Sequence, residues 1–100
     1  MPKVSVDVPH TLTEEEALGR VKGLMTDVKR QYATYFTDLQ ENWSEKRGEF
    51  SLKAMGFNIS GTIAVAPQQV AFRADLPFAA TPFKGRIEDA VRDEATRLLA

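Results

Sequence analysis

The sequence has no cysteine and only one histidine among its 100 residues. Without cysteine it can form no disulfide, and a transition-metal site needs several His or Cys ligands. His10 is therefore the only residue around which a Ser-His-Asp arrangement could be built. Ser5 and Asp7 alternate on a predicted strand and cannot converge on it, so we expect His10 to have a structural role in a turn. No catalytic residue, cofactor or metal site is predicted, and we expect a protein that is not an enzyme.

The chain also lacks an excess of basic charge and long apolar runs. Its 13 Lys and Arg residues are balanced by 14 Asp and Glu residues, which gives a formal net charge of -1. The basic residues are scattered along the sequence, whereas a nucleic-acid-binding protein concentrates them on one face. No stretch approaches the ~20 apolar residues of a membrane span, and the first residues do not resemble a signal peptide. We therefore expect a cytoplasmic protein that neither binds nucleic acid nor spans a membrane.

What is present predicts a single α+β domain over residues 1–100. A hydrophobic content of 43% is enough for one core at this length. Valines at every second position of residues 4–8 predict a half-buried strand. Thr13 and Glu16 have the spacing of a capping box, which predicts that a long helix starts there. The apolar stripe of this helix comprises Ala17, Leu18, Val21, Leu24, Met25, Val28, Tyr32, Tyr35 and Phe36.

From residue 37 onward the apolar residues recur at every second position, and three turns allow the strand pairing to be proposed. The proposed pairs are Ala54 with Phe57, Leu52 with Ile59 and Phe50 with Gly61 across residues 55–56, Val65 with Val70, Ile63 with Phe72 and Gly61 with Ala74 across residues 67–68, and Trp43 with Phe50 across a loop of residues 45–48. Gly48 is expected to take positive φ in that last loop. The apolar members then all share one face of the sheet.

A second amphipathic helix is predicted from about residue 83 to the end, after a segment from Pro77 to Pro82 that cannot continue as a strand. The order of elements is therefore one strand, one helix, four strands and one helix. If the first strand runs beside the last, the strand order is 1-5-4-3-2. This predicts a two-layer α+β fold with an antiparallel sheet of about five strands and two helices on one face, similar to helix-grip folds.

Gly61 marks the first candidate binding site. With Ala74 beside it in the sheet, it leaves a dip on the buried face. One interpretation is a pocket for an apolar ligand between the sheet and the long helix. The other is that Phe50 leans over Gly61, or that Tyr32 or Leu24 of the helix fills the dip. Close packing of protein interiors favours filling.

The second candidate site is an apolar cluster at one end of the sheet, near Met55. The proposed pairing places Phe57 and Phe78 in one row, close to Phe83 in sequence. Such a cluster is ordinary core if it is covered, and a docking surface for a partner if it is exposed. Trp43, like His10, is assigned a structural role.

The strand that contains Trp43 is predicted to lie at the edge of the sheet. Glu41 places a charge on its inner side, as expected for a protected edge. The same edge leaves an opportunity for a homodimer through strand pairing.

Short motifs along nearly the whole chain resemble the small polyhydroxyalkanoic acid system proteins. The motifs are Pro9-His10 with Leu12, Glu16-Ala17 and Arg20, Trp43, Phe50, the run from Gly56 to Ile63 with Val65, and Leu76, Phe78, Phe83-Lys84, Arg86-Ile87-Glu88 and Leu98-Leu99. The family's genes lie among those for storage-polyester metabolism, and some members are associated with granules. The resemblance implies a bacterial cytoplasmic accessory protein at the granule surface, and it brings no assigned catalytic residue.

Three functions remain open at this point. The first is a non-enzymatic accessory protein that docks on polyester granules or on another protein through Phe57, Phe78 and Phe83. The second is a carrier of an acyl or other small apolar ligand held above Gly61. The third is an enzyme that acts on a hydroxyacyl compound through His10. We rank them in this order.

Overall fold

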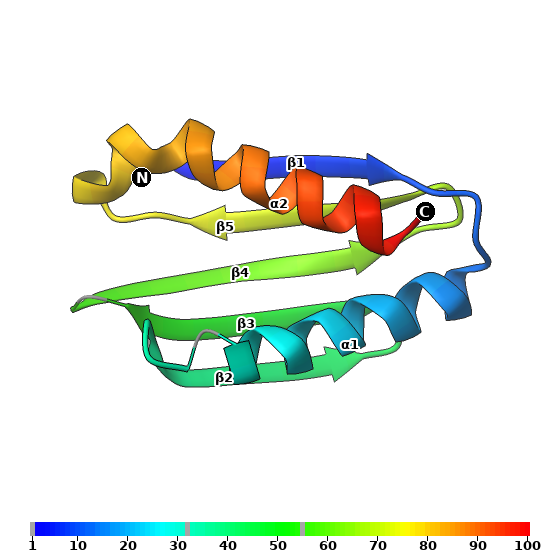
Figure 1. Cartoon of the computed structure of the whole chain (residues 1–100), viewed down its shortest axis with the longest axis horizontal. Coiled ribbons are helices and arrows are strands. Elements are labelled where there is room, and N and C mark those ends of the chain that lie inside the picture. Colours follow the sequence, from blue (N-terminus) through cyan, green and yellow to red (C-terminus); the bar gives the residue numbers. More distant parts are fainter. Residues whose placement is uncertain (1, 32, 55) are drawn as a thin grey trace.

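The computed structural model describes residues 2–31, 33–54 and 56–100. Its elements, in chain order, are β1 (Lys3–Pro9), α1 (Glu14–Gln31), β2 (Thr37–Ser44), β3 (Arg47–Ala54), β4 (Phe57–Val65), β5 (Gln69–Asp75), the 3-10 helix η1 (Phe78–Phe83) and α2 (Lys84–Leu98). The strands form one antiparallel sheet in the order β1-β5-β4-β3-β2, with both helices on the same face (Figure 1). The predicted fold class and strand order are confirmed.

The core begins with the alternating valines of β1. Val4, Val6 and Val8 are at most 2% exposed, whereas the residues between them face water. These valines pair with β5 and lie beneath the helical layer, which contributes Ala17, Val21, Met25, Ala95 and Leu99 to the buried core. Burial of one face of β1 therefore fixes which side of the sheet the helices cover.

Helix α1 starts at the predicted cap. The N–H of Glu16 donates to Thr13 Oγ1 at 3.1 Å, and the Thr13 hydroxyl donates to Glu16 Oε1 at 3.1 Å. The helix ends at Gln31, so the prediction that it continues to Phe36 is wrong. Residues 34–37 are all β-branched or aromatic, and such residues favour extended backbone over helix. Tyr32, which the prediction placed on the buried stripe, lies outside the described residues.

The strand registers predicted for β3, β4 and β5 are confirmed. The structure pairs Ala54 with Phe57, Leu52 with Ile59, Phe50 with Gly61, Gly61 with Ala74, Ile63 with Phe72 and Val65 with Val70. Met55, in the turn between β3 and β4, is not among the described residues, but the pairs that flank it agree with a two-residue turn. Consistent apolar alternation on both strands explains the success, because a slip by one residue would expose the apolar set.

The register predicted between β2 and β3 is wrong by two residues. Trp43 pairs with Gly48 and Glu41 pairs with Phe50, so the turn is only two residues long. Glu45, rather than Gly48, takes positive φ, at 54°. A Cβ on Gly48 would lie 2.8 Å from two carbons of the Trp43 ring. Gly48 is therefore needed because an indole packs directly on its backbone, and the same side of the sheet remains buried.

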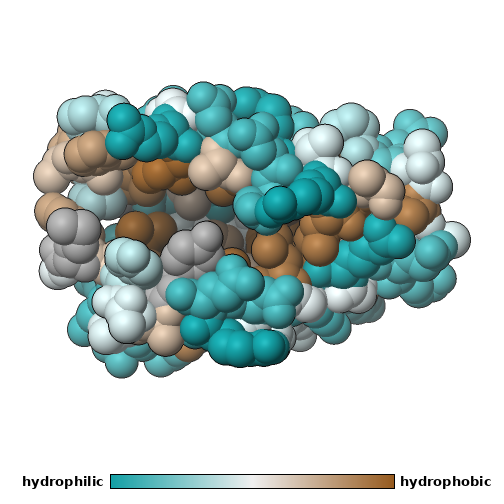
Figure 2. Space-filling model, viewed as in Figure 1, coloured by the Kyte–Doolittle hydropathy of each residue, from teal (hydrophilic) through white to brown (hydrophobic). Residues whose placement is uncertain are grey.

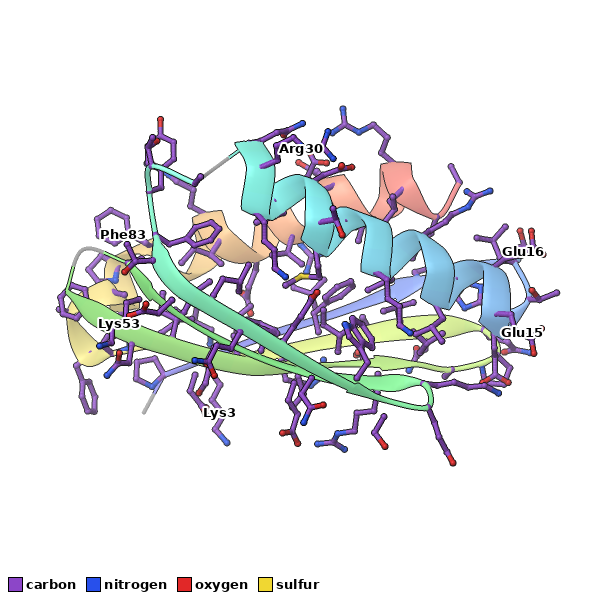
Figure 3. The ribbon with its side chains drawn as sticks, turned by 90° about the horizontal axis from the view of Figure 1, so that it is seen from below. Lys3, Glu15, Glu16, Arg30, Lys53 and Phe83 are labelled. Atoms are coloured by element: carbon purple, nitrogen blue, oxygen red, sulfur yellow. The ribbon has the colours of Figure 1, made fainter. Side chains whose placement is uncertain are left out.

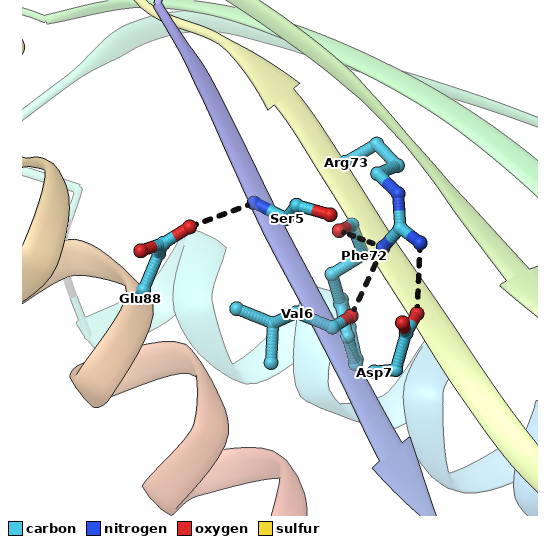
Figure 4. A network of polar contacts seen from close by, with 6 residues as sticks. All are labelled: Ser5, Val6, Asp7, Phe72, Arg73 and Glu88. Atoms are coloured by element: carbon cyan, nitrogen blue, oxygen red, sulfur yellow. Dashed lines mark hydrogen bonds and ion pairs between the residues drawn. The ribbon is translucent and has the colours of Figure 1, made fainter.

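The two edge strands of the sheet, β1 and β2, differ in how their outer sides are covered. At the β1 edge, the backbone N–H of Ser5 donates to Glu88 Oε2 of α2 at 3.0 Å (Figure 4). Behind it, Arg73 Nη1 donates to the carbonyls of Val6 (3.3 Å) and Phe72 (2.9 Å). Arg73 Nη2 also lies 2.9 Å from Asp7 Oδ1. Strand β1 is thus fixed to β5 on one side and covered by a carboxylate on the other.

At the β2 edge, no helix runs along the outside of the strand (Figure 1). Its pairing with β3 is irregular between Thr37 and Gln40, where Asp38 has a φ of 56°. Glu41 points to the inner side, as predicted, and its Oε1 lies 3.2 Å from Lys29 Nζ of α1. An irregular pairing and an inward charge are both features that oppose strand addition.

The two helices are close together at one end of the molecule and diverge toward the other (Figure 1). Where they meet, Arg20 Nη1 of α1 donates to the backbone oxygens of Leu98 (3.0 Å) and Ala100 (2.8 Å). The molecule measures 37 × 23 × 22 Å, so the diverging ends of the helices lie near one tip of an elongated body.

Candidate functional site

The most prominent feature of the surface is a set of aromatic side chains at that tip. Within the described residues, the exposed large hydrophobic side chains are Tyr35 (69% exposed), Phe57 (40%), Phe78 (76%) and Phe83 (52%). They come from the loop before β2, the start of β4 and the two ends of η1, which lie at the same end of the sheet in Figure 1. We call these four residues the aromatic end.

Each of these positions is set by a local feature of the sequence. Phe57 opens β4 opposite Ala54 and is partly exposed on the helix side of the sheet. Pro77 precedes η1 with extended backbone, and Pro82 lies within it, so β5 cannot continue. The prediction that the strand cannot continue through this segment is confirmed. Phe78, however, follows the sheet and does not pair in a row with Phe57, so that part of the prediction is wrong.

Next to the aromatic end, the helical layer leaves part of the sheet uncovered. Figure 2 shows a hollow between α1 and α2 with hydrophobic side chains at its base. On the sheet, Leu52, Ala54 and Ile59 are only half-buried, although they face the helices. The hollow follows from the divergence of the two helices (Figure 1).

Gly61 lies in the middle of the sheet, where β4 and β5 approach each other closely. A Cβ at this position would lie 2.6 Å from Phe50 Cζ, 2.2 Å from the Arg73 backbone oxygen and 3.0 Å from Ala74 Cα. The ring of Phe50 therefore leans over Gly61, as the second of the two interpretations expects. The glycine is required by this close approach.

His10 is 7% exposed, and both of its ring nitrogens contact backbone groups. The N–H of Leu12 donates to Nδ1 at 3.1 Å, so Nδ1 is the acceptor and Nε2 carries the proton. Nε2 then donates to the Ala66 carbonyl at 2.9 Å. The neutral imidazole joins the segment after β1 to the turn between β4 and β5.

Trp43 lies beneath α1, with its ring packed on Gly48. Lys22 of α1 places its Nζ 5.4 Å from the centre of the ring, within the range of a cation–π contact. One end of α1 is also held by an ion pair of 3.1 Å between Glu14 Oε2 and Lys46 Nζ. Charged contacts spaced along α1 thus fasten it to the β2–β3 hairpin. The indole N–H of Trp43 is buried and has no hydrogen-bond partner among the described residues.

The opposite face of the sheet carries no helix and is concave. It holds an open groove of about 470 Å³. Its polar side chains are Gln40, Asn42, Glu49, Ser51, Ser60, Thr62 and Asp75. The sequence predicted a wet face here and missed its concavity, for which the signal is the small Ser and Thr side chains at alternating positions of β3 and β4. Phe50 and Gly61 also line this groove, so its surface is mixed rather than purely polar.

Sequence reasoning also missed two further features of the aromatic end. Tyr35 was expected on the buried stripe of the long helix, but the early end of α1 exposes it. Lys84 and Arg86 were read only as family motif residues, yet they occupy the first turn of α2, where no acidic residue is present. Cations are unfavourable at a helix N-terminus by about 0.3–1 kcal/mol each. The absence of acidic residues from that turn is a signal that the sequence does contain.

The described part of the chain contains neither a candidate metal site nor a candidate membrane-spanning helix. No group of three or more His, Cys, Asp or Glu side chains there could hold a metal ion. None of the helices in residues 2–31, 33–54 and 56–100 is both long and apolar enough to cross a membrane.

The fold and the site together define a small two-layer α+β protein with an exposed aromatic end. Its histidine is hydrogen-bonded to backbone groups. Comparison with known families identifies it further. The profile of the family described as "Putative polyhydroxyalkanoic acid system protein" matches residues 4–99. The chain belongs to this family, as its sequence motifs predicted. No curated protein and no solved structure matches it.

Replacing Gly61 by alanine is expected to destabilise the fold severely. The new Cβ would meet the backbone oxygen of Arg73, so β4 and β5 would have to separate, at a cost of roughly 3 kcal/mol or more. Gly23→Ala is the matched control, because a Cβ on Gly23 meets nothing within 4 Å on the exposed side of α1. It should stabilise the protein by about 0.5–1 kcal/mol. Urea unfolding of both variants measures the difference, and equal midpoints would contradict the close approach.

Replacing His10 by alanine is expected to lower the free energy of unfolding by about 2–3 kcal/mol, because the Ala66 carbonyl and the Leu12 N–H lose their partner. Thr11→Ala, at the exposed neighbouring position, should change it by less than about 0.5 kcal/mol. Urea denaturation followed by tryptophan fluorescence provides the measurement. A loss no larger in the His10 variant than in the Thr11 variant would argue against the structural role.

Proposed function

We propose that this protein is a non-enzymatic, cytoplasmic accessory protein of polyhydroxyalkanoate storage that docks on polyester granules through the aromatic end. The observation that carries the proposal is the exposure of four large aromatic side chains at one tip. Single exposed apolar residues are ordinary, but a cluster of them is typical of an interaction surface. Membership of the family supplies the cellular setting.

The environment of His10 supports a role without catalysis. A general acid or base needs a ring nitrogen that can reach the substrate. Both nitrogens of His10 are within 3.1 Å of backbone groups, and the residue is 7% exposed. The sequence has no other histidine and no cysteine to take that part.

We prefer docking on the granule to homodimer formation through β2 as the function of this protein. The irregular pairing at Asp38 and the inward charge of Glu41 both oppose strand addition at that edge. The aromatic end carries no comparable protection. Docking on another protein through the same four residues is the alternative that the experiment below must separate.

Replacing Phe78 and Phe83 by serine together is expected to weaken granule binding by about tenfold or more, because two apolar contacts with the granule are lost. Both side chains are more than half exposed, so the fold should survive. Co-sedimentation with purified polyester granules, stripped of protein, measures the fraction bound.

The matched control replaces Gln68, in the turn at the opposite end of the sheet, and Gln69, the exposed first residue of β5, by serine. It should sediment as the wild type does. Equal sedimentation of the wild type and both variants, or no sedimentation of any of them, would refute docking through the aromatic end. Binding only to granules that keep their own proteins would favour the protein partner instead.

A second function, a carrier of an acyl or other small apolar ligand, is favoured by one observation. The hollow between the helices has hydrophobic side chains at its base (Figure 2). Because Phe50 fills the dip at Gly61, we place the ligand in the hollow beside Leu52, Ala54 and Ile59.

The carrier function predicts saturable binding of a fluorescent fatty acid in solution. Ala54→Trp should reduce the affinity by about tenfold, because a large ring would occupy the hollow. Lys53→Trp places the same ring on the opposite face of β3 and should leave the affinity unchanged. Fluorescence titration is the measurement, and an unsaturable signal from the wild type would rule the carrier out.

A further inference from the structure

Basic side chains follow the aromatic end directly in sequence at Lys84 and Arg86, and Lys53 lies at the same end of the molecule (Figure 3). In Figure 3, Phe83 and Lys53 lie at one end of the molecule, and Glu15 and Glu16 lie at the other. Lys53 is near the end of β3, and Lys3, at the start of β1, projects from the side of the sheet that faces away from the helices (Figure 3). An acidic side chain lies beside each of these two lysines, so charges of both signs are present at this end.

The acidic partners of these two lysines hold them only loosely. Lys3 Nζ lies 3.9 Å from Asp75 Oδ1, and Lys53 Nζ lies 3.8 Å from Asp38 Oδ2. The side chains of the lysines are 75% and 59% exposed, so these ion pairs are weak and can be exchanged for other anions.

Lys84 and Arg86 add two cations directly after Phe83. Neither of them has an ion-pair partner in the described part of the chain. Their position in the first turn of α2 opposes the helix dipole, whereas α1 starts with three consecutive glutamates, as the dipole favours. A local arrangement that costs stability is typical of a functional surface.

Aromatic side chains bordered by Lys and Arg are the combination that anchors proteins at the interface of an anionic lipid layer. The rings enter the boundary between headgroups and acyl chains, and the cations pair with the headgroups. A bare polyester surface or a neutral apolar protein would leave the cations without a function.

We infer that the aromatic end binds an anionic lipid layer, with Phe78 and Phe83 inserted and Lys84 and Arg86 against the headgroups. This inference rests on the docking proposed above and specifies the surface that is recognised. The acidic start of α1 then faces away from the lipid, because like charges repel it from an anionic surface. The long axis of the molecule stands on the layer rather than lying along it.

Charge reversal at the start of α2 tests the inference without a risk to the fold. In the Lys84→Glu, Arg86→Glu variant, acidic residues at a helix N-terminus should raise the melting temperature rather than lower it. Vesicles of phosphatidylglycerol and phosphatidylcholine in equal amounts should bind the wild type at least about tenfold better than vesicles of phosphatidylcholine alone. The variant should lose this preference.

The matched control is Arg47→Glu, Arg92→Glu, which makes the same change in net charge away from the aromatic end. It should keep the preference for anionic vesicles, and high salt should weaken binding of both the wild type and the control. Equal binding to the two kinds of vesicle, or an equal loss in the two charge variants, would overturn the inference.

Lipid-free polyester particles separate this inference from the proposed function. If the wild type binds these particles through Phe78 and Phe83 but has no preference for anionic vesicles, the proposed docking holds. The inference that the aromatic end binds an anionic lipid layer is then wrong. If the Phe78→Ser, Phe83→Ser variant binds both particles and vesicles as the wild type does, docking through the aromatic end is itself refuted.

Discussion

Burial of one valine-rich face is the constraint on which the rest of the structure depends. Val4, Val6, Val8 and Val70 are at most 2% exposed, and they require a helical layer above β1 and β5. Helix α2 and the first turns of α1 provide it, so the helices must meet there. Among the described residues, no third α-helix covers the remaining sheet. The part of the sheet near the aromatic end is thus left uncovered because the helices meet over the buried valines.

Much of the fold could be predicted because its signals are local and agree with one another. Alternating apolar residues specify β1 and β3 to β5, and Thr13 with Glu16 specifies the start of α1. The β2–β3 register could not be predicted, because two turn lengths bury the same face and only the contact of Trp43 with Gly48 decides between them. The end of α1 was missed for a similar reason, since an apolar stripe continues past the last helical residue.

Three of the four residues of the aromatic end were predictable from the sequence, but their exposure was not. Phe57, Phe78 and Phe83 have the same apolar character whether they are buried or not, and only the reach of the helical layer decides. Tyr35 is exposed instead of buried because α1 ends at Gln31, five residues before the predicted end. His10 illustrates the opposite case, since a lone histidine next to a proline already suggested a turn, and the structure places both ring nitrogens against backbone.

The carboxylate of Glu88 against the Ser5 N–H has a consequence for self-association. A sheet with two free edges can add copies without limit and form a filament. In the described structure one edge is closed by α2, so growth could occur only at β2, and two copies joined there would have no further free edge. The cover of the β1 edge by α2 therefore opposes polymerisation through the sheet.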